Sequence, residues 1–169
     1  MTKDDIIIKS PEKKDFLKMC RVLNEAEKVY KDIDPYYEKF TTKDLLEMNS
    51  KKNILIIEIN KKILGLGIWS IKNKKICWIS ILHIKPNNQK TGLGSKLIKE
   101  IEKRAIKNEC KLIMLEIFPK ANWAKNFYLK NDYKILPKKE YNKKIFKNIL
   151  SLKAKTTVMI KIIKKREKK

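Results

Sequence analysis

The short segment from Gln89 to Ser95, QKTGLGS, has the residue types and spacing of an anion-binding turn. It follows an apolar stretch that ends at Ile84, and it precedes a run in which apolar residues recur at helical spacing. The first amides of a helix lack intrahelical partners, and the helix dipole places partial positive charge there. Gly92 and Gly94 have no side chain to keep a ligand away from those amides. The segment therefore predicts a site for a phosphate or a pyrophosphate.

The spacing of the glycines excludes two common phosphate-binding loops. A P-loop needs a glycine, four residues and then Gly-Lys-Ser or Gly-Lys-Thr, and a dinucleotide fingerprint needs a third glycine. The pattern here is Gln-x-x-Gly-x-Gly, preceded by Ile-x-Pro at residues 84–86. This combination resembles the acyl-CoA-binding signature of the GNAT superfamily of N-acyltransferases. For the motif alone, the alternative is a strand-to-helix connector whose glycines only permit a tight turn.

The resemblance extends to both sides of the turn. Residues 124–133, AKNFYLKNDY, are similar to the superfamily pattern Ala-x-x-Phe-Tyr-x-x-x-Gly-Phe, and residues 53–71 resemble its second and third strands. Two positions depart from the pattern. Asp132 stands where glycine is usual, and the asparagine expected three residues before Ala124 appears instead as Asn122. Aspartate can adopt the left-handed conformation that glycine supplies at a helix end, so we expect the turn to be kept.

The resemblance implies that acetyl-CoA is the co-substrate and indicates which residues bind it. The backbone of the strand before the turn would pair with the pantetheine arm, and the turn would hold the pyrophosphate. Asn122 is a further predicted contact. The predicted cofactor-binding residues of the strand and the turn are Leu82, His83, Ile84, Gln89, Lys90, Thr91, Gly92, Leu93, Gly94 and Ser95.

Two side chains are candidates for proton transfer. Glu116 matches the glutamate of a Leu-Glu-Val segment that acts as base in the ribosomal-protein and N-terminal-amine acetyltransferases, the branch that this chain resembles most. Tyr128 matches the tyrosine that protonates the coenzyme A thiolate. The alternatives are a strand-end carboxylate paired with a lysine for Glu116 and an aromatic packed in the core for Tyr128. His83, the only histidine, ranks below Glu116 as a base, because its position in the resemblance contributes backbone.

The energy of deprotonation bears on the identity of the acceptor. Deprotonating a lysine-type amine at pH 7 costs roughly 4.6 kcal/mol, whereas an α-amine costs roughly 1 kcal/mol. A site with one carboxylate and no conspicuous histidine favours the α-amine, so we predict the N-terminus of a protein or peptide as the acceptor. The alternative enzyme acetylates a small cationic amine such as a polyamine, which Asp32, Asp34 and Glu38 would attract.

The charge of the chain suggests a second class of function. Lysine and arginine number 42 against 19 acidic residues, which gives a net charge of +23. Such a surface attracts nucleic acid or ribosomes, so a non-catalytic nucleic-acid-binding protein on the same fold is the alternative. The basic residues are spread from end to end, and the composition is rich in lysine, isoleucine and asparagine. We therefore favour a compositional origin of the charge over a dedicated nucleic-acid site.

We expect one N-acetyltransferase domain over residues 1–169, with residues 164–169 as a basic tail. The fold class is α/β (α+β): a GNAT-type mixed, mostly antiparallel central sheet of six to seven strands with about four flanking helices. Ser10 and Pro11 predict the start of the first helix. The strands are predicted over residues 5–9, 53–59, 63–72, 75–84, 111–118 and 156–163, with turns at 60–62 and 73–74. Residues 138–155 fit either a helix through Ile145, Ile149 and Leu152 or a lysine-rich hairpin.

The remaining sequence signals concern the compartment and assembly. Cys20, Cys77 and Cys110 lack the paired spacing of a zinc site or of a secreted disulfide framework, so we expect reduced thiols and no metal. No apolar run approaches the 18 or so residues that a membrane helix needs. These signals predict a cytoplasmic enzyme that binds no membrane. The oligomeric state stays open between a monomer and a homodimer.

Overall fold

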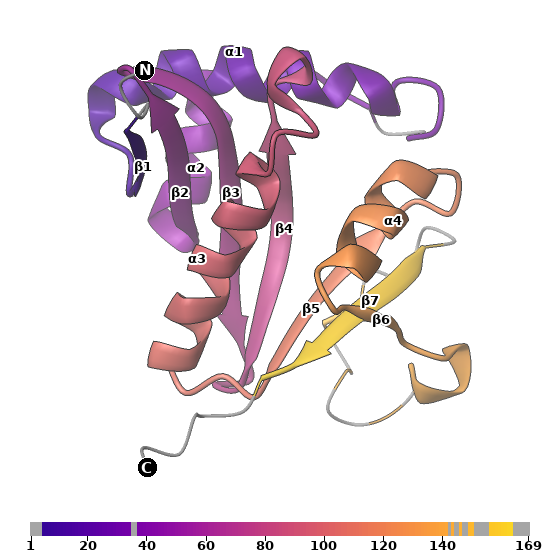
Figure 1. The fold of residues 1–169 in the computed structure, drawn as a ribbon. Coiled ribbons are helices and arrows are strands. Elements are labelled where there is room, and N and C mark those ends of the chain that lie inside the picture. The colour runs from indigo at the N-terminus through magenta and orange to yellow at the C-terminus, as the bar shows by residue number, and fades with distance from the viewer. Residues whose placement is uncertain are drawn as a thin grey trace. The chain divides into compact units, whose positions relative to one another are not determined.

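The computed structural model describes residues 5–34, 37–141, 143, 146, 149–150 and 156–163. Within them, four α-helices accompany a sheet of seven strands in the order β1-β2-β3-β4-β5-β7-β6 (Figure 1). Four of the described strand pairings are antiparallel, and the pairing of β4 with β5 is parallel. The predicted fold class is therefore confirmed. The chain forms two compact units, Met1–Ser70 with Ser80–Ile101 and Ile71–Ile79 with Glu102–Lys169.

The first unit is built around the early strands. Its elements are β1 (Ile6–Lys9), α1 (Phe16–Glu27), α2 (Thr42–Lys51), β2 (Asn53–Ile59), most of β3 (Lys62–Lys72), the later part of β4 (Ile76–Ile84) and the start of α3 (Leu93–Lys107). Strand residues at alternate positions point to opposite faces of the sheet. Both faces are apolar here, because residues 54–57 of β2 are all buried.

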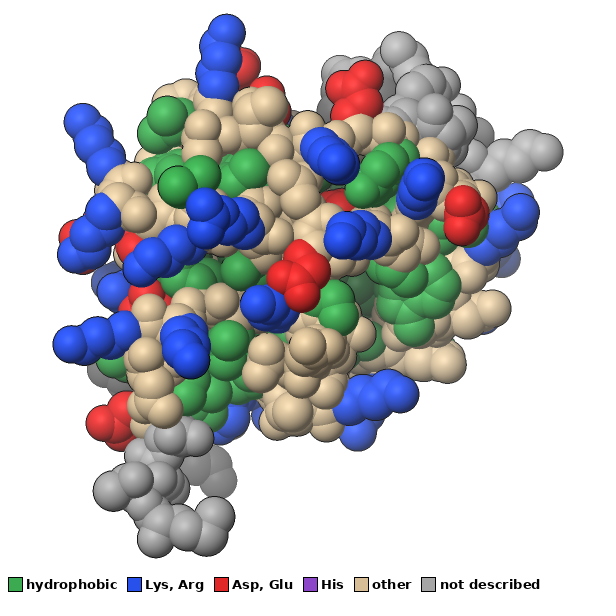
Figure 2. All heavy atoms as spheres, turned by 90° about the horizontal axis from the view of Figure 1, so that it is seen from above, with side chains coloured by type: hydrophobic (Ala, Val, Ile, Leu, Met, Phe, Trp, Pro, Cys, Tyr) green, Lys and Arg blue, Asp and Glu red, His purple; other side chains and the backbone are tan. Residues whose placement is uncertain are grey.

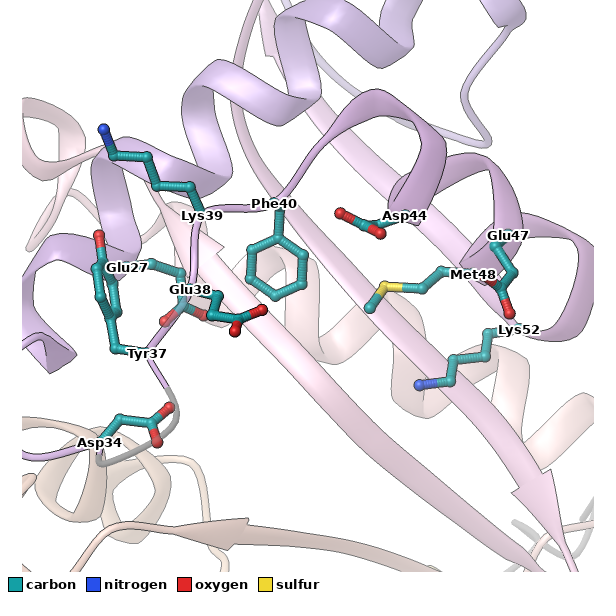
Figure 3. Close-up of a pocket in the computed structure, with 10 residues that line it drawn as sticks. All are labelled: Glu27, Asp34, Tyr37, Glu38, Lys39, Phe40, Asp44, Glu47, Met48 and Lys52. Atoms are coloured by element: carbon teal, nitrogen blue, oxygen red, sulfur yellow. The ribbon is translucent and has the colours of Figure 1, made fainter.

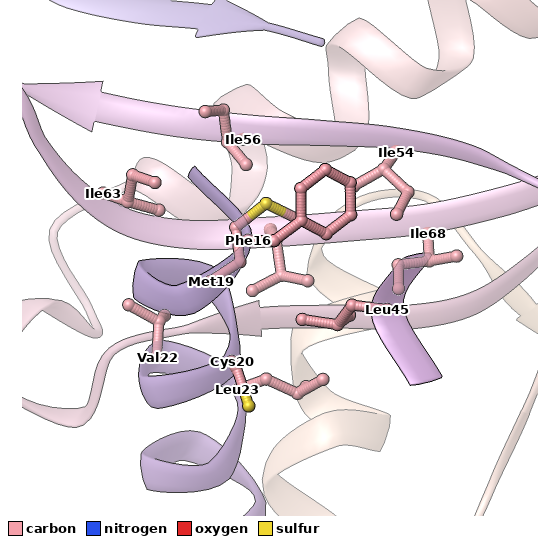
Figure 4. Packing of buried hydrophobic residues seen from close by; sticks show 11 residues of the cluster. Phe16, Met19, Cys20, Val22, Leu23, Leu45, Ile54, Ile56, Ile63 and Ile68 are labelled. Atoms are coloured by element: carbon pink, nitrogen blue, oxygen red, sulfur yellow. The ribbon is translucent and has the colours of Figure 1, made fainter. Parts of the chain in front are cut away.

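The helices of the first unit cover both faces. Side chains of α1 and α2 meet one face of β2 and β3 in a cluster of Phe16, Met19, Cys20, Val22, Leu23, Leu45, Ile54, Ile56, Ile63, Leu66 and Ile68 (Figure 4). The opposite face receives α3 at Gly67, where an added Cβ would lie 2.8 Å from Cδ1 of Ile101. Glycine at this position therefore lets the helix approach the strand closely.

Two tight turns connect the strands from β2 to β4. Asn60 and Lys61 have φ angles of 50° and 62°, and Asn73 and Lys74 have φ angles of 49° and 58°. Two successive residues with positive φ are the mark of the type I′ turn, whose twist matches that of an antiparallel hairpin. Asparagine tolerates this conformation better than most residues do. The turns predicted from these asparagines are confirmed.

The second unit contains the remaining strands. Its elements are the first part of β4, the end of α3, β5 (Leu112–Ile117), α4 (Asn122–Lys130), the short β6 (Lys134–Ile135) and β7 (Thr157–Ile162). Antiparallel pairing sets Glu116 of β5 opposite Val158 of β7. Ile76, Met114, Leu136, Phe146 and Val158 form its buried cluster.

The structure corrects the predicted start of the first helix. A 3₁₀ turn at Lys13–Asp15 precedes α1, and the carboxylate of Asp15 accepts a hydrogen bond from the backbone N–H of Glu12 at 2.9 Å. This bond satisfies an amide of the first turn, so the chain enters the helix after Glu12 and not at Pro11.

The sequence did not assign two regions of the chain. The two-residue strand β6 was not predicted, because it is too short to show a pattern. Within residues 138–155 the structure describes a 3₁₀ turn at Lys138–Glu140, whereas Ile145, Leu152 and the tail at 164–169 lie outside the described residues. In the part of the chain that the structure describes, no helix has both the length and the apolar composition to cross a bilayer.

Candidate functional site

Side chains of the turn between β4 and α3 hold its backbone in shape. The amide nitrogen Nε2 of Gln89 donates a hydrogen bond to the carbonyl oxygen of Ile84 at 3.0 Å, which ties the turn to the last residue of β4. The hydroxyl of Thr91 donates to the carbonyl oxygen of Asn88 at 2.7 Å. Lys90 has a left-handed φ of 63°. Hydrogen bonds inside the turn and to the end of β4 therefore hold the segment that precedes α3.

Gly92 is the point at which the turn becomes a helix. Its φ is 86°, which favours glycine, and a Cβ added there would meet no atom within 4 Å. The N–H of Lys96 donates to the carbonyl oxygen of Gly92 at 3.0 Å, so this is the first helical bond of α3. The amides of Leu93, Gly94 and Ser95 precede it and lack intrahelical acceptors. Open space beside free helix-start amides fits a pyrophosphate.

The side chain of His83 makes a contact that the sequence did not predict. Its Nε2 lies 2.7 Å from Oε1 of Glu27, the last residue of α1. The two side chains are 13% and 15% exposed. The ring of Tyr30 packs edge-on against the imidazole with 5.8 Å between ring centroids. A separation of 56 residues hides this pair from any local pattern.

The two predicted proton-transfer residues lie in the second unit. Glu116 is half-buried on β5, and its sequence neighbours Leu115 and Ile117 are buried. Tyr128 is 7% exposed on α4, and its ring packs edge-on against those of Phe127 and Tyr133. Asn122 is the exposed first residue of the same helix. The first unit holds all the other predicted cofactor-binding residues.

The unusual Asp132 keeps the turn after α4. Its φ is 67°, which is the left-handed conformation expected where the superfamily has glycine. Behind this turn, Nζ of Lys161 donates to both carboxylate oxygens of Glu102, at 3.0 and 3.1 Å, and to the carbonyl oxygen of Asn131 at 3.0 Å. Burial, and next the charge of Glu102, raise the pKa of Tyr133, so its phenol stays protonated.

A pocket of about 500 Å³ opens in the first unit beside the end of α1 (Figure 3). Five carboxylates line it together with two lysines, two aromatic residues and a methionine. The lining residues are Glu27, Asp34, Tyr37, Glu38, Lys39, Phe40, Asp44, Glu47, Met48 and Lys52. We refer to this site as the acidic pocket.

The sequence identified part of the acidic pocket. It predicts that Asp34 and Glu38 attract a cationic amine, and both line the pocket, whereas Asp32 does not belong to the lining. The carboxylates contributed by the two helices were missed. Glu47 of α2 lies three residues after Asp44, so the two share one side of that helix. The three-residue spacing of these two carboxylates was the sequence signal that could have predicted the part of the pocket that α2 forms.

Hydrogen bonds fix two walls of the acidic pocket. The side-chain amide of Asn24 donates to the carbonyl oxygen of Phe40 at 2.8 Å and accepts from the N–H of Phe40 at 2.8 Å. At the start of α2, Asp44 accepts from the N–H and from the hydroxyl of Thr41, both at 2.7 Å. These bonds from Thr41 lower the pKa of Asp44, so its carboxylate is ionised at neutral pH.

The charge elsewhere on the chain has the opposite sign. Lysine and arginine side chains are dispersed among hydrophobic and acidic ones over the face shown in Figure 2, without gathering into one patch. The acidic pocket therefore differs from the composition of the whole chain, which carries a net charge of +23.

Comparison with protein families shows that the model of the acetyltransferase (GNAT) family matches residues 17–133. No sequence among the curated proteins matches this chain. Among solved structures, the fold resembles an acetyltransferase from Streptococcus agalactiae 2603, with 16% identity, a TM-score of 0.77 and coverage of 94% of this chain and 98% of that one.

Two further structures show the same fold. The PaiA N-acetyltransferase from Thermoplasma acidophilum, solved in complex with coenzyme A, has 18% identity and a TM-score of 0.76 over 94% of this chain and 99% of that one. The ribosomal-protein-S18-alanine N-acetyltransferase from Escherichia coli has 14% identity and a TM-score of 0.66 over 92% and 91%.

Proposed function

Because this chain belongs to the acetyltransferase (GNAT) family, we propose that it transfers the acetyl group of acetyl-CoA to a small primary amine that carries more than one positive charge. The acidic pocket is the observation that carries this proposal. A polyamine or a lysine-like diamine has the matching chemistry. The sequence favours a peptide α-amine and has the small cationic amine as its alternative, and the acidic pocket moves our preference to the alternative.

The charge of the pocket supports a cationic acceptor. Five carboxylates against two lysines reverse the balance of the whole chain, in which basic residues outnumber acidic ones by 42 to 19. A cleft lined with one sign of charge raises the local concentration of the opposite charge. A peptide α-amine has a single positive charge. A polyamine has several, and each of them can pair with a different carboxylate of the pocket.

The apolar part of the lining suits the chain that joins the charges. Tyr37, Phe40 and Met48 lie among the carboxylates, and Figure 3 shows Phe40 between the side chains of Glu38 and Met48. Aromatic faces attract cations, and their edges pack against methylene groups. The volume of about 500 Å³ falls within the range of small-molecule sites, roughly 300 to 1,000 Å³.

We assign the acetyl-CoA pyrophosphate to the turn at Gln89–Ser95. The support is the start of α3 with open space at Gly92, and the Thermoplasma acidophilum PaiA N-acetyltransferase, which has the same fold, was solved in complex with coenzyme A. Bound acetyl-CoA supplies a thioester carbonyl for attack by the amine. An ammonium nitrogen must lose two protons to become an amide nitrogen, and the departing thiolate must gain one.

Glu116 and Tyr128 are our candidates for two of these transfers. Glu116 would accept a proton from the nitrogen, and Tyr128 would donate one to the thiolate. Glu116→Gln and Tyr128→Phe should each lower kcat by about 10²-fold or more, the usual effect of losing an acid or base. Coenzyme A affinity, measured by calorimetry, should stay nearly unchanged. Unchanged turnover in both variants would refute these assignments.

An acceptor screen tests the substrate class. Spermidine, putrescine, Nα-acetyl-lysine amide and peptides without lysine are compared by release of the coenzyme A thiol. Spermidine should give the highest kcat/KM, and added salt should raise its KM, because salt screens the pocket charges. Preferential acetylation of the peptides would support the N-terminal acceptor and contradict the proposal.

Paired variants connect the preference to the acidic pocket. Glu38→Gln removes one lining charge and should raise the KM for spermidine about two- to fivefold, the effect of one exposed ion pair. The KM for acetyl-CoA should not change. Glu100→Gln removes a charge from α3, outside the pocket, and is the control that should leave both KM values unchanged.

A further inference from the structure

His83 and Glu27 form an oriented pair of a base and a carboxylate within the first unit. The 2.7 Å contact joins Nε2 of the imidazole to Oε1 of Glu27, and both side chains are largely buried. An ionised carboxylate has no proton to donate, so it can only accept a hydrogen bond. A neutral imidazole that bonds to it must therefore carry its own proton on Nε2. Nδ1 then keeps the lone pair. This is the arrangement of a histidine base held in one tautomer by a carboxylate.

The pair adjoins the acidic pocket. Glu27 is itself one of the lining residues, and Figure 3 shows it on the side of the pocket that also holds Tyr37 and Glu38. His83 reaches Glu27 from β4, in the segment Leu82–Ile84 that is predicted to run along the pantetheine arm. Glu27 therefore connects the proposed amine pocket to His83, whose own side chain is not among the lining residues, and His83 belongs to the strand at which we expect the thioester.

A multiply charged acceptor needs such a group. A lysine-type ammonium at pH 7 costs roughly 4.6 kcal/mol to deprotonate, and its nitrogen must lose two protons in all. Glu116 accounts for one of them in the proposed function. The other must leave before the nitrogen has a lone pair with which to attack.

We propose that Nδ1 of His83, with its imidazole oriented by Glu27, accepts the proton that the acceptor ammonium loses before attack. The N–H bond of the ammonium breaks and an N–H bond forms on Nδ1, which gives an imidazolium that the Glu27 carboxylate stabilises. The freed lone pair forms the bond to the acetyl carbon, and the carbon–sulfur bond breaks with its electron pair on sulfur. This inference rests on the proposed function, which places the acceptor amine in the acidic pocket.

The charged and titratable groups around the imidazole come from three elements. Glu27 belongs to α1, and Tyr30 follows it in a 3₁₀ turn. Lys85, just after β4, pairs with Glu25 of α1 at 3.4 Å. That neighbouring ion pair joins the same two segments and is electrically balanced, which makes Glu25 a matched control for Glu27.

The test measures kcat and KM for spermidine and for the best peptide of the screen from pH 6 to pH 10. His83→Gln should lower kcat at pH 7 by about 10²-fold or more. The deficit should shrink as pH rises, because solvent then supplies the free amine. Glu27→Gln should show a smaller loss with the same trend, and Glu25→Gln should match the wild type. Thermal unfolding of each variant confirms its fold. If His83→Gln does not fold, the pH trend of kcat in Glu27→Gln tests the proposal in its place.

The outcomes separate the two proposals. If peptides are acetylated and spermidine is not, the proposed acceptor class is wrong, and the same variants on the peptide still test the base. A loss of kcat in His83→Gln that is constant at every pH would overturn the role of His83, because a structural defect does not depend on the fraction of free amine. A loss of less than about threefold, small against the usual effect of a base, would overturn it as well.

Discussion

The side-chain amide of Asn24 satisfies both backbone groups of Phe40: it donates to the carbonyl oxygen and accepts from the N–H, each at 2.8 Å. The thiol of Cys20 donates to the same carbonyl oxygen at 3.0 Å. Two residues of α1 therefore fix the loop that forms a wall of the acidic pocket. The site that we propose for the acceptor therefore depends on hydrogen bonds made by residues outside its lining.

Removing this contact should affect binding of the acceptor. Asn24→Ala leaves the N–H of Phe40 without its partner and its carbonyl oxygen with only the weak thiol donor of Cys20, which should cost about 1–3 kcal/mol of unfolding free energy. A loosened wall should also raise the KM for spermidine about fivefold or more, with a smaller effect on the KM for acetyl-CoA. Urea unfolding and steady-state kinetics measure the two effects.

Asn108→Ala is the matched control for Asn24→Ala. Its amide donates to the carbonyl oxygen of Arg104 at 2.8 Å at the exposed end of α3, so it also removes a side-chain bond to backbone. We expect no change in either KM. An equal rise in the KM for spermidine in both variants would contradict a specific role of Asn24.

The pH dependence of stability should reveal the bond between Asp44 and Thr41. Hydrogen bonds from Thr41 lower the pKa of Asp44 in the folded state. The contribution to stability is therefore complete above about pH 4, the unfolded value, and is lost as pH falls through the lower folded pKa. Asp44→Asn should be less stable than the wild type at pH 7, and the difference should narrow at pH 3 in urea unfolding.

Thr41 provides the control for Asp44. Thr41→Ala removes the N-cap of α2 and should cost about 1 kcal/mol. In that background, Asp44→Asn should cost less than it does alone, because the hydroxyl donor is gone. If Asp44→Asn and the wild type differ in unfolding free energy by the same amount at pH 3 and at pH 7, this bond does not lower the pKa of Asp44.

Local patterns predicted the turns and every described strand except β6, since the residues that decide them are neighbours in sequence. Asn60 and Asn73 tolerate positive φ, and each is followed by a lysine that adopts it too. The first helix shows the limit of such patterns. Proline is favoured as the first residue of a helix, but the hydrogen bond from the N–H of Glu12 to Asp15 places the start of the helical segment after Glu12.

Contacts between distant residues account for what the sequence did not predict at the candidate site. His83 looked like an isolated strand histidine because Glu27 is 56 residues away. Asp34 and Glu38 were recognised from the loop alone, whereas Glu27, Asp44 and Glu47 join them only when α1 and α2 pack on the sheet. Long-range packing thus created the concentration of charge that shifted the preferred acceptor.

The ion pair of Lys161 with Glu102 should be important for the stability of the second unit. The side chains are 21% and 14% exposed, and Nζ of Lys161 also bonds the carbonyl oxygen of Asn131. Lys161→Met leaves a largely buried carboxylate without this cation and should cost about 2 kcal/mol. Thermal and urea unfolding measure the loss.

Two variants calibrate the effect of Lys161→Met. Lys14→Met breaks a surface pair with Glu12, whose side chains are 72% and 59% exposed, and should change stability by less than about 1 kcal/mol. Glu102→Gln combined with Lys161→Met should recover part of the loss, because the unpaired charge is gone. If the double variant is instead clearly less stable than Lys161→Met, the loss in Lys161→Met does not come from the unpaired charge of Glu102.

Gly92 tests the anion site at the start of α3. Gly92→Ala forces a φ of 86° on a residue with a Cβ, which should cost about 1–2 kcal/mol of unfolding free energy. The new methyl group meets no protein atom within 4 Å, so it occupies the space that we assign to the pyrophosphate. Coenzyme A affinity, measured by calorimetry, should fall about tenfold or more, which corresponds to about 1.4 kcal/mol.

Gly92→Asn separates the backbone effect from the effect on the ligand. Asparagine tolerates positive φ better than alanine, so this variant should regain much of the lost stability. Its larger side chain still lies in the space beside the helix-start amides, so its affinity for coenzyme A should remain as low as that of Gly92→Ala. Wild-type affinity in Gly92→Asn would show that the coenzyme does not approach the backbone at this glycine, and the pyrophosphate would then have to bind elsewhere on the chain.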